Sequence, residues 1–274
     1  MTEPQVTDRR GVERGPDRRR HSRDPFVEFD DVYKAYGPKQ VLRGANLQVF
    51  RGEVVVILGG SGTGKSVTLR HMLGLEAPDS GRVFVEEEDV TDFPEEELYR
   101  VRKKFGMLFQ SAALFDSMTV FENVAFPLRE HTEMTESEIT RAVHEKLELV
   151  NLPNTGHLMP VDLSGGMRKR VGLARAIILD PKVILYDEPT TGLDPITAQT
   201  INELIVDLQA KLNVTSVVVT HDIHSAFSVG DRIAFLNEGV FEWVGSINEA
   251  RDASHPKLRE FLKASAVVAA QPTK

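Results

Sequence analysis

The 274-residue chain contains no cysteine. Neither a disulfide framework nor a cysteine-ligated metal site is therefore available, and we expect a reducing compartment. Uninterrupted apolar runs are short, for example residues 54–58 and 266–270. They fall far below the ~20 residues that a membrane-spanning helix needs. If the protein powers transport, we expect another polypeptide to supply the channel.

The chain also lacks an excess of positive charge, because its 41 acidic residues outnumber its 33 Lys and Arg residues and the formal net charge is −8. This balance argues against a nucleic-acid binder that relies on global positive charge. Residues 1–24 hold seven arginines against five acidic residues, with few large apolar side chains and several prolines and glycines. We expect this tail to be disordered and solvated, with weak attraction to anionic lipid headgroups as the alternative. It lacks the apolar segment of a secretory signal.

A glycine-rich stretch follows the apolar run at residues 54–58. It reads Gly59-Gly60-Ser61-Gly62-Thr63-Gly64-Lys65-Ser66, and a helical pattern covers residues 67–75. The run is typical of a strand buried on both faces of a parallel sheet. The glycines let backbone N–H groups point at phosphate oxygens, Lys65 reaches the β- and γ-phosphates, and Ser66 offers a hydroxyl to Mg²⁺. The spacing predicts a phosphate loop rather than an ordinary glycine-rich turn.

An acidic pair ends a second buried run. Residues 183–186 lead directly into Asp187 and Glu188. One carboxylate can hold Mg²⁺, directly or through water, and another can orient or deprotonate an attacking water. An acidic pair at a strand end is often merely solvated. Downstream of a phosphate loop, it indicates the second half of a nucleotide site.

Three further motifs make residues 26–246 resemble the ATP-binding-cassette (ABC) ATPases. They are Leu108-Phe109-Gln110, the signature Leu163-Ser164-Gly165-Gly166-Met167, and Thr220-His221-Asp222. The resemblance implies an α/β fold: a P-loop NTPase (RecA-like) core with an antiparallel β subdomain and an inserted helical subdomain. It also implies ATP and Mg²⁺ as ligands and ATP hydrolysis as the reaction.

The resemblance assigns roles residue by residue. Tyr36, in Lys34-Ala35-Tyr36-Gly37, corresponds to the aromatic that stacks on adenine. The implied catalytic residues are Glu188 as general base, His221 at the γ-phosphate, Gln110 and Lys65. The implied metal ligands are Ser66, Gln110 and Asp187. The implied nucleotide-binding residues are Tyr36, Gly59, Gly60, Ser61, Gly62, Thr63, Gly64, Lys65, Ser66, Val67, Ser164, Gly165, Gly166 and Asp194. The last four are expected to act across the interface of a homodimer.

Taken singly, three of these residues have ordinary interpretations. Tyr36 would be a core or edge aromatic, His221 a strand-end histidine, and Gln110 an unremarkable polar residue. Their order relative to the two strong motifs favours the functional interpretation. Two positions depart from the family pattern, since Met167 stands where glutamine is usual and Val67 where threonine is usual. We expect Val67 to affect nucleotide affinity modestly, because its backbone N–H can still bind.

The remaining pattern predicts the domain organisation. Residues 26–50 indicate a small antiparallel sheet, with turns at Gly37-Pro38 and Arg51-Gly52. Further strands are expected near residues 82–85, 217–219 and 233–236, and helices at 95–103, 137–150 and 166–179. The predicted units are a disordered Arg-rich tail at 1–24, an ABC nucleotide-binding domain at 25–246 with its helical subdomain at about 112–165, and a short C-terminal helical tail at 247–274.

The spacing between motifs and the number of cassettes distinguish several kinds of ABC ATPase. Only 97 residues separate Ser66 from Ser164, which leaves no room for the long coiled coils of chromosome-type members. A single cassette also differs from the paired cassettes usual in translation-type members. The chain resembles the separate ATPase subunit of a bacterial transporter. Alternatives are a soluble non-transport ABC ATPase acting as an assembly scaffold, and an importer or exporter ATPase for another substrate.

Residues 107–132 refine this resemblance; they read MLFQSAALFDSMTVFENVAFPLREHT. Together with residues 163–167 and 187–197, they are similar to the MCE-associated (Mla-type) lipid-transport ATPases. That similarity implies a peripheral homodimer on the cytoplasmic face of the inner membrane, beneath an integral-membrane permease and connected through it to a periplasmic MCE lipid-binding protein. Apolar residues 112–115 and 121–126 either fill the helical subdomain or form a notch for a permease helix after Gln110. The lipid cargo rests on resemblance alone.

Overall fold

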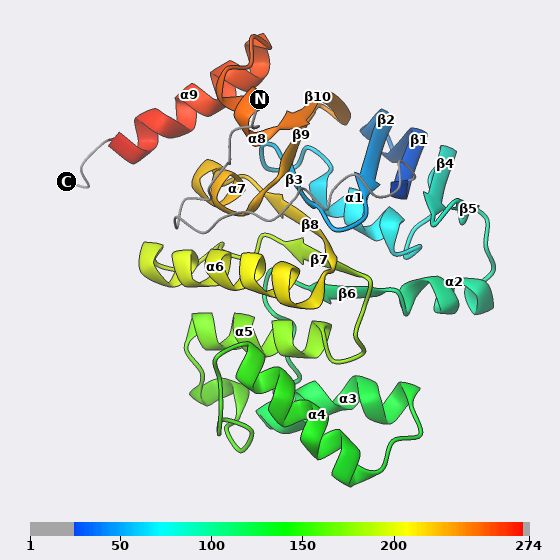
Figure 1. Cartoon of the computed structure of the whole chain (residues 1–274). Helices are drawn as coiled ribbons and strands as arrows, with labels where there is room; N and C mark the ends of the chain where they lie inside the picture. Colours follow the sequence, from blue (N-terminus) through cyan, green and yellow to red (C-terminus); the bar gives the residue numbers. More distant parts are fainter. Residues whose placement is uncertain (1–24, 271–274) are drawn as a thin grey trace, which may run out of the picture.

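The computed structural model describes residues 25–270. The predicted tail at 1–24 lies outside the described residues. Two sheets organise the chain (Figure 1). The central sheet has the order β10-β9-β3-β8-β7-β6, and the smaller sheet has the order β2-β1-β4-β5. The central strands are β3 (Val54–Leu58), β6 (Phe105–Leu108), β7 (Val183–Asp187), β8 (Thr215–Thr220), β9 (Arg232–Asn237) and β10 (Val240–Ser246).

The central sheet is parallel except for β10, and it separates two apolar layers. Alternate residues of β3 face opposite sides, with Val54 and Val56 in one hydrophobic cluster and Val55 and Ile57 in the other. This burial on both faces explains the uninterrupted apolar runs. Leu58 of β3 pairs with Thr220 of β8. The carboxyl ends of the neighbouring strands therefore meet at one edge, where open α/β sheets bind ligands.

The smaller sheet is antiparallel, as predicted. It consists of β1 (Pro25–Tyr36), β2 (Lys39–Phe50), β4 (Ser80–Val85) and β5 (Glu88–Asp89). Its apolar side chains share a cluster with one face of the central sheet. Glu86, which follows β4, forms ion pairs with Lys104 and Lys182, which precede β6 and β7. These contacts connect the two sheets electrostatically.

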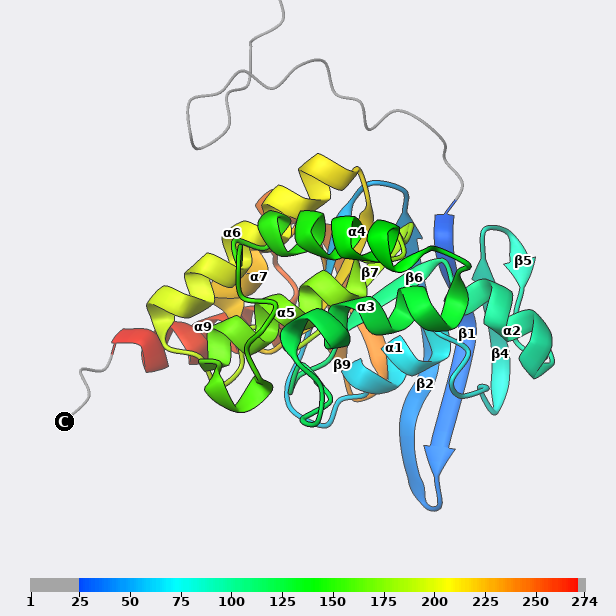
Figure 2. The ribbon, with the colours of Figure 1, turned by 90° about the horizontal axis from the view of Figure 1, so that it is seen from below.

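Helices α3 (Val120–His131), α4 (Glu136–Leu149) and α5 (Gly165–Ala176) form a group on the other side of the central sheet (Figures 1 and 2). Thr119 and Thr135 begin α3 and α4 with capping boxes, in which each threonine and the glutamate three residues later satisfy one another's backbone N–H groups. The apolar faces of all three helices contribute to the same core cluster. Much of the apolar sequence after Gln110 is therefore used in packing.

The other helices lie around the two sheets (Figure 1). They are α1 (Lys65–Met72), α2 (Glu95–Arg102), α6 (Pro195–Leu212), α7 (Ile223–Val229), α8 (Ile247–Arg251) and α9 (Pro256–Ala270), with a short 3₁₀ turn η2 (Pro160–Asp162) before α5. Helix α9 packs through Phe261, whose ring centroid lies 5.5 Å from that of Phe235 on β9. Within residues 25–270, no helix combines the length and apolar character needed to cross a membrane.

The predicted strands and helices are present, with shifted ends. The helix expected at residues 67–75 spans Lys65–Met72, because Gly64 already caps it and Gly74 adopts a positive φ just after it. The helix expected at 166–179 ends at Ala176, three residues earlier than the Asp180-Pro181 pair suggested. Propensity and proline signals fix helix ends only to within a few residues. The predicted subdomain boundaries remain predictions.

Candidate nucleotide site

The phosphate loop joins β3 to α1 at the ligand-binding edge. Gly64 caps α1 with φ 110° and no side-chain hydrogen bond, and the first turn contains no acidic residue. A Cβ atom at Gly64 would lie 3.0 Å from the carbonyl oxygen of Val41. Glycine is therefore required both by its backbone conformation and by the close approach of β2. The open helix N-terminus carries the partial positive charge that binds phosphate.

Lys65 lies folded over the loop it belongs to. Its side chain is buried, and Nζ donates hydrogen bonds to the carbonyl oxygens of Gly59 and Gly60 at 3.0 and 2.9 Å. Nζ also lies 3.4 Å from Oε1 of Glu188. The ammonium is thus held between the phosphate loop and the acidic pair, where it can exchange these partners for phosphate oxygens.

Ser66 and Asp187 meet across the two motifs. Ser66 Oγ donates a hydrogen bond to Asp187 Oδ1 at 3.0 Å. Burial and the charge of Glu188 raise the pKa of Asp187, whereas the Ser66 hydrogen bond and Lys65 lower it, and the net shift is upward. Two oxygen donors beside a phosphate cradle suit Mg²⁺, which usually takes one or two protein ligands and completes its shell with phosphate and water. The residues present therefore fit Mg²⁺.

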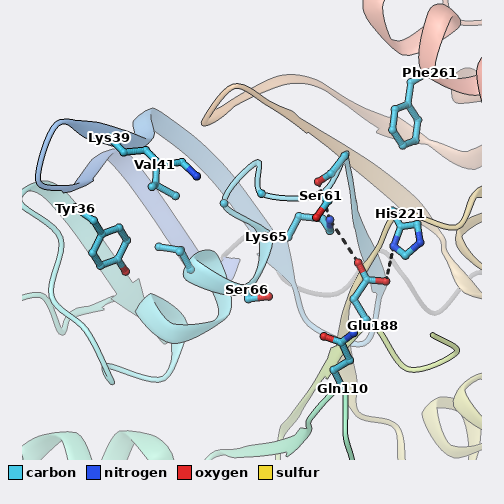
Figure 3. Close-up of a pocket in the computed structure, with 14 residues that line it drawn as sticks. Tyr36, Lys39, Val41, Ser61, Lys65, Ser66, Gln110, Glu188, His221 and Phe261 are labelled. Carbon is cyan, nitrogen blue, oxygen red and sulfur yellow. Dashed lines mark hydrogen bonds and ion pairs between the residues drawn. The ribbon is translucent and has the colours of Figure 1, made fainter. Parts of the chain in front are cut away.

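Glu188 occupies a constrained position at the end of β7. Its φ of 49° is unusual for a residue with a side chain. The Thr191 hydroxyl donates to Oε2 at 3.0 Å, and His221 Nδ1 lies 2.9 Å from the same oxygen. With Lys65 on Oε1, both carboxylate oxygens are engaged. These contacts orient the carboxylate toward the pocket, as Figure 3 shows.

A pocket of about 740 Å³ lies at this edge of the sheet (Figure 3). The lining residues that the sequence predicted are Tyr36, Gly60, Ser61, Gly62, Gly64, Lys65, Ser66, Val67, Gln110, Glu188 and His221. The sequence did not predict Lys39, Val41 or Phe261, which also line it. Lys39 and Val41 follow the β1–β2 turn, so proximity to Tyr36 was a usable signal. Phe261 comes from α9, and no local signal indicated it.

Tyr36 is fixed at the rim of the pocket by its hydroxyl group. The hydroxyl donates to Glu76 at 2.5 Å and accepts from Arg70 at 3.2 Å. The residue remains 42% exposed. Burial and the bond to Glu76 raise the pKa of Tyr36. Because the ring is anchored at one end and open on the pocket side, it is placed to stack on a flat base.

Seven predicted site residues lie outside this pocket lining. Ser164 begins α5, where its hydroxyl accepts from the N–H of Met167 at 3.3 Å. Gly165 and Gly166 form the first turn of that helix. Asp194 begins α6 and accepts hydrogen bonds from the N–H groups of Ile196 and Thr197 at 3.1 and 3.0 Å. Gly59, Thr63 and Asp187 are also absent from the lining, although Asp187 contacts it through Ser66.

Comparison with known proteins agrees with this geometry. Residues 42–191 match the family model described as "ABC transporter". The chain belongs to the ABC transporter family. It is 42% identical over 236 residues to the "Probable ribonucleotide transport ATP-binding protein mkl" of Mycobacterium leprae, covering 86% of this chain and 68% of that protein. It is therefore an ATP-binding ATPase coupled to transport, as the sequence motifs predicted.

Two further relatives extend this result. The "Intermembrane phospholipid transport system ATP-binding protein MlaF" of Haemophilus influenzae is 41% identical over 238 residues, covering 87% of this chain and 90% of that protein. The dimeric post-hydrolysis structure of the ATP-binding cassette MJ0796, bound to ADP and Pi, is 35% identical with a TM-score of 0.75. That match covers 81% of this chain and 98% of the other. The predicted P-loop NTPase fold of an ABC ATPase is confirmed.

Proposed function

We propose that this ABC ATPase drives lipid transport as a homodimer with two shared nucleotide sites. The convergence of Lys65, Glu188 and His221 in one pocket carries the catalytic part of the proposal. Lys65 binds the β- and γ-phosphates in place of its present partners, and Tyr36 stacks on the base. Glu188 takes a proton from the attacking water, while His221 holds the γ-phosphate side of the site.

The metal in this proposal is Mg²⁺. Ser66 and Asp187 would hold it, with the Gln110 side chain as a further oxygen donor from the end of β6. When bound, the ion neutralises charge on the phosphates. The protein's own contribution is to bring a hydroxyl, a carboxylate and an amide to one edge of the sheet. None of these groups alone would select the ion.

The shared sites follow from where the signature lies. Ser164 and Asp194 are exposed and do not line the pocket of their own chain. The N-terminus of α5 nevertheless carries partial positive charge and the exposed Ser164 hydroxyl, which suit phosphate. A second copy related by two-fold symmetry would place this helix over the partner's nucleotide. The dimeric state of the solved cassette supports this arrangement.

An integral-membrane permease is the proposed second partner. Phe109 and Phe115 lie on either side of residues 110–114 and remain 40% and 43% exposed. Neighbouring apolar residues are instead packed into the helical group. Such aromatic exposure suits a helix from another chain. The ATPase would then lie peripherally on the cytoplasmic face of the inner membrane.

Two relatives suggest different cargo. The MlaF match spans 90% of that protein, whereas the mkl match spans 68% of its own. Near-full-length similarity favours phospholipid transport, with a periplasmic MCE lipid-binding protein contacted through the permease. A ribonucleotide transporter and a soluble scaffold ATPase are the competing outcomes.

The test is purification of the tagged chain from detergent-solubilised membranes, followed by reconstitution into phospholipid vesicles. We expect an integral-membrane partner in stoichiometric amount, and ATP-dependent transfer of fluorescent phospholipid by the reconstituted complex. The Glu188→Gln chain serves as the matched control. Only soluble partners, or transfer of ribonucleotides without lipid transfer, would contradict the lipid-transport proposal.

A further inference from the structure

Lys169 of α5 is a buried cation that connects two parts of the nucleotide site. It is 5% exposed, although lysine is rarely buried. Its Nζ donates hydrogen bonds to the backbone carbonyl oxygens of Gln110 and Glu188, at 2.5 and 3.1 Å. Gln110 follows β6 and Glu188 follows β7, so one ammonium bridges the ends of two strands.

The surroundings explain why this charge is tolerated. Burial lowers the pKa of Lys169, and the neighbouring carboxylates of Asp187 and Glu188 oppose that shift. Two carbonyl acceptors and two nearby negative charges together offset part of the cost of removing an ammonium from water. An apolar side chain of similar length would fill the volume but leave both carbonyls without this donor.

The backbone adopts unusual conformations at Glu188 and just after Gln110. Glu188 has φ 49°, and Ala112 and Ala113 have φ 63° and 47°. Left-handed conformations are unfavourable for a residue with a side chain, so they persist only where the surroundings hold them. Helix α5 also contacts the second point through Arg175, whose Nη2 donates to the Ala112 carbonyl oxygen at 2.8 Å. The helix thus fixes the segment after β6 at two places.

We propose that Lys169 is a positioning residue for hydrolysis, which holds Gln110 and Glu188 of its own chain in their working geometry. The proposal rests on the functions assigned above to Gln110 and Glu188. Lys169 lies five residues after Ser164 in the same helix. The helix that would cover the partner's nucleotide therefore also fixes the hydrolytic residues of its own chain.

The test compares Lys169→Met and Lys169→Arg with Arg170→Met. Arg170 is the adjacent basic residue of α5, and its guanidinium donates to the carbonyl oxygen of Asn151, outside the pocket. Each chain is assayed for steady-state ATP hydrolysis, for binding of a fluorescent ATP analogue, and for its thermal unfolding midpoint. Lys169→Gln, which keeps an amide donor, replaces Lys169→Met if the methionine variant does not fold.

We expect Lys169→Met to lower kcat about 10- to 100-fold, because small misplacement of catalytic groups has effects of this size. Nucleotide binding should change by no more than about threefold, because the phosphate loop is untouched. Lys169→Arg should recover part of kcat, and Arg170→Met should remain within about twofold of the unmodified chain. The expected pattern is therefore a loss in kcat that is specific to the Lys169 position.

An unchanged kcat in Lys169→Met would overturn the inference. So would equal losses of kcat in Lys169→Met and Arg170→Met, or a loss that follows nucleotide binding or the unfolding midpoint, because these results indicate a general structural role. Glu188→Gln is measured in parallel. If that chain still hydrolyses ATP at the normal rate, the proposed function itself fails, whereas an inactive Glu188→Gln with a normal Lys169→Met refutes only the positioning role.

Discussion

The hydroxyl of Ser66 lies 3.0 Å from a carboxylate oxygen of Asp187, although the two residues are 121 positions apart in the chain. This hydrogen bond joins the N-terminus of α1 to the end of β7, and so brings the two halves of the phosphate site together. It also defines the oxygen donors that we assign to Mg²⁺.

Asp187→Asn should weaken the use of Mg²⁺ while preserving the fold. The amide retains the shape and can still accept from Ser66, but it lacks the negative charge that favours a divalent cation. We expect turnover to fall at least about 100-fold in millimolar Mg²⁺ and the Mg²⁺ concentration for half-maximal activity to rise. Activity is titrated against Mg²⁺ at fixed ATP. Asp180→Asn, an exposed carboxylate paired with Lys146, is the control; an unaltered Mg²⁺ dependence in Asp187→Asn would contradict the assignment.

Lys65→Ala should weaken both nucleotide binding and hydrolysis. The substitution removes the buried ammonium that lies between the phosphate loop and Glu188. Charge-assisted bonds to phosphate are worth about 1.5–3 kcal/mol each, so we expect at least a tenfold loss in ATP affinity. Fluorescent-nucleotide binding measures it, with Lys39→Ala as a comparison at the exposed rim. If Lys65→Ala binds ATP as tightly as the unmodified chain, the glycine loop is not the phosphate cradle.

Glu188→Gln should separate binding from hydrolysis. The amide preserves shape but cannot accept the proton of the attacking water, so we expect kcat to fall by about 10²–10⁴ with ATP binding retained. Closed dimers should accumulate with ATP and be visible by size-exclusion chromatography. A variant that turned over at nearly the normal rate would show that another group is the base.

Glu86→Gln tests the electrostatic connection between the two sheets. Burial raises the pKa of Glu86, but hydrogen bonds from Lys104, Lys182 and Arg51 outweigh it and hold the pKa at about 2. Because the folded-state pKa is depressed, the stabilisation is complete above the unfolded pKa of about 4.5 and declines as pH falls toward 2.

We expect Glu86→Gln to lower the free energy of unfolding by about 1–2 kcal/mol at pH 7, after allowance for solvent screening. The difference from the unmodified chain should shrink by pH 3.5. Urea denaturation at both pH values measures it. A difference that did not depend on pH would assign the effect to packing rather than charge. Glu96→Gln on the exposed surface of α2 is the control.

The sequence predicted the parts of the fold that depend on uninterrupted patterns. Both faces of β3 and β7 are buried, so each strand appears in the sequence as a continuous apolar run. Helix α3 was not predicted, although Thr119 and Glu122 form a capping box, because Pro127 lies inside the helix. Strand β6 is only four residues long, too short for a periodic signal.

Local motifs also predicted most of the residues that line the pocket, because the phosphate loop and the polar residues at the strand ends are recognisable in the sequence. These motifs could not show which distant segments of the chain lie close together in the fold. Phe261 reaches the pocket because α9 packs on β9. Lys169 of α5 reaches the backbone carbonyl oxygens of Gln110 and Glu188, which lie 59 and 19 positions away in the chain. Lys169 lies within the signature region, but nothing in its sequence neighbours indicates that it is buried.

The central claim is that each nucleotide site is shared between two chains, and mixed dimers test it most directly. Ser164→Arg places bulk and charge at the N-terminus of α5 and removes its cap, at a cost of about 1 kcal/mol that leaves the fold intact. Lys65→Ala damages the phosphate loop. Each variant alone forms dimers with two damaged sites. In a heterodimer of the two, both substitutions fall on one shared site and the other site is complete.

The measurement is the ATPase rate of separately tagged Ser164→Arg and Lys65→Ala chains after mixing and purification of the heterodimer through both tags. The shared-site account predicts that hydrolysis, nearly absent in either homodimer, reappears in the purified heterodimer, with one complete site turning over. If each chain instead carried a self-sufficient site, no chain in the mixture would be intact. A confirmed heterodimer without recovered hydrolysis would therefore contradict the account.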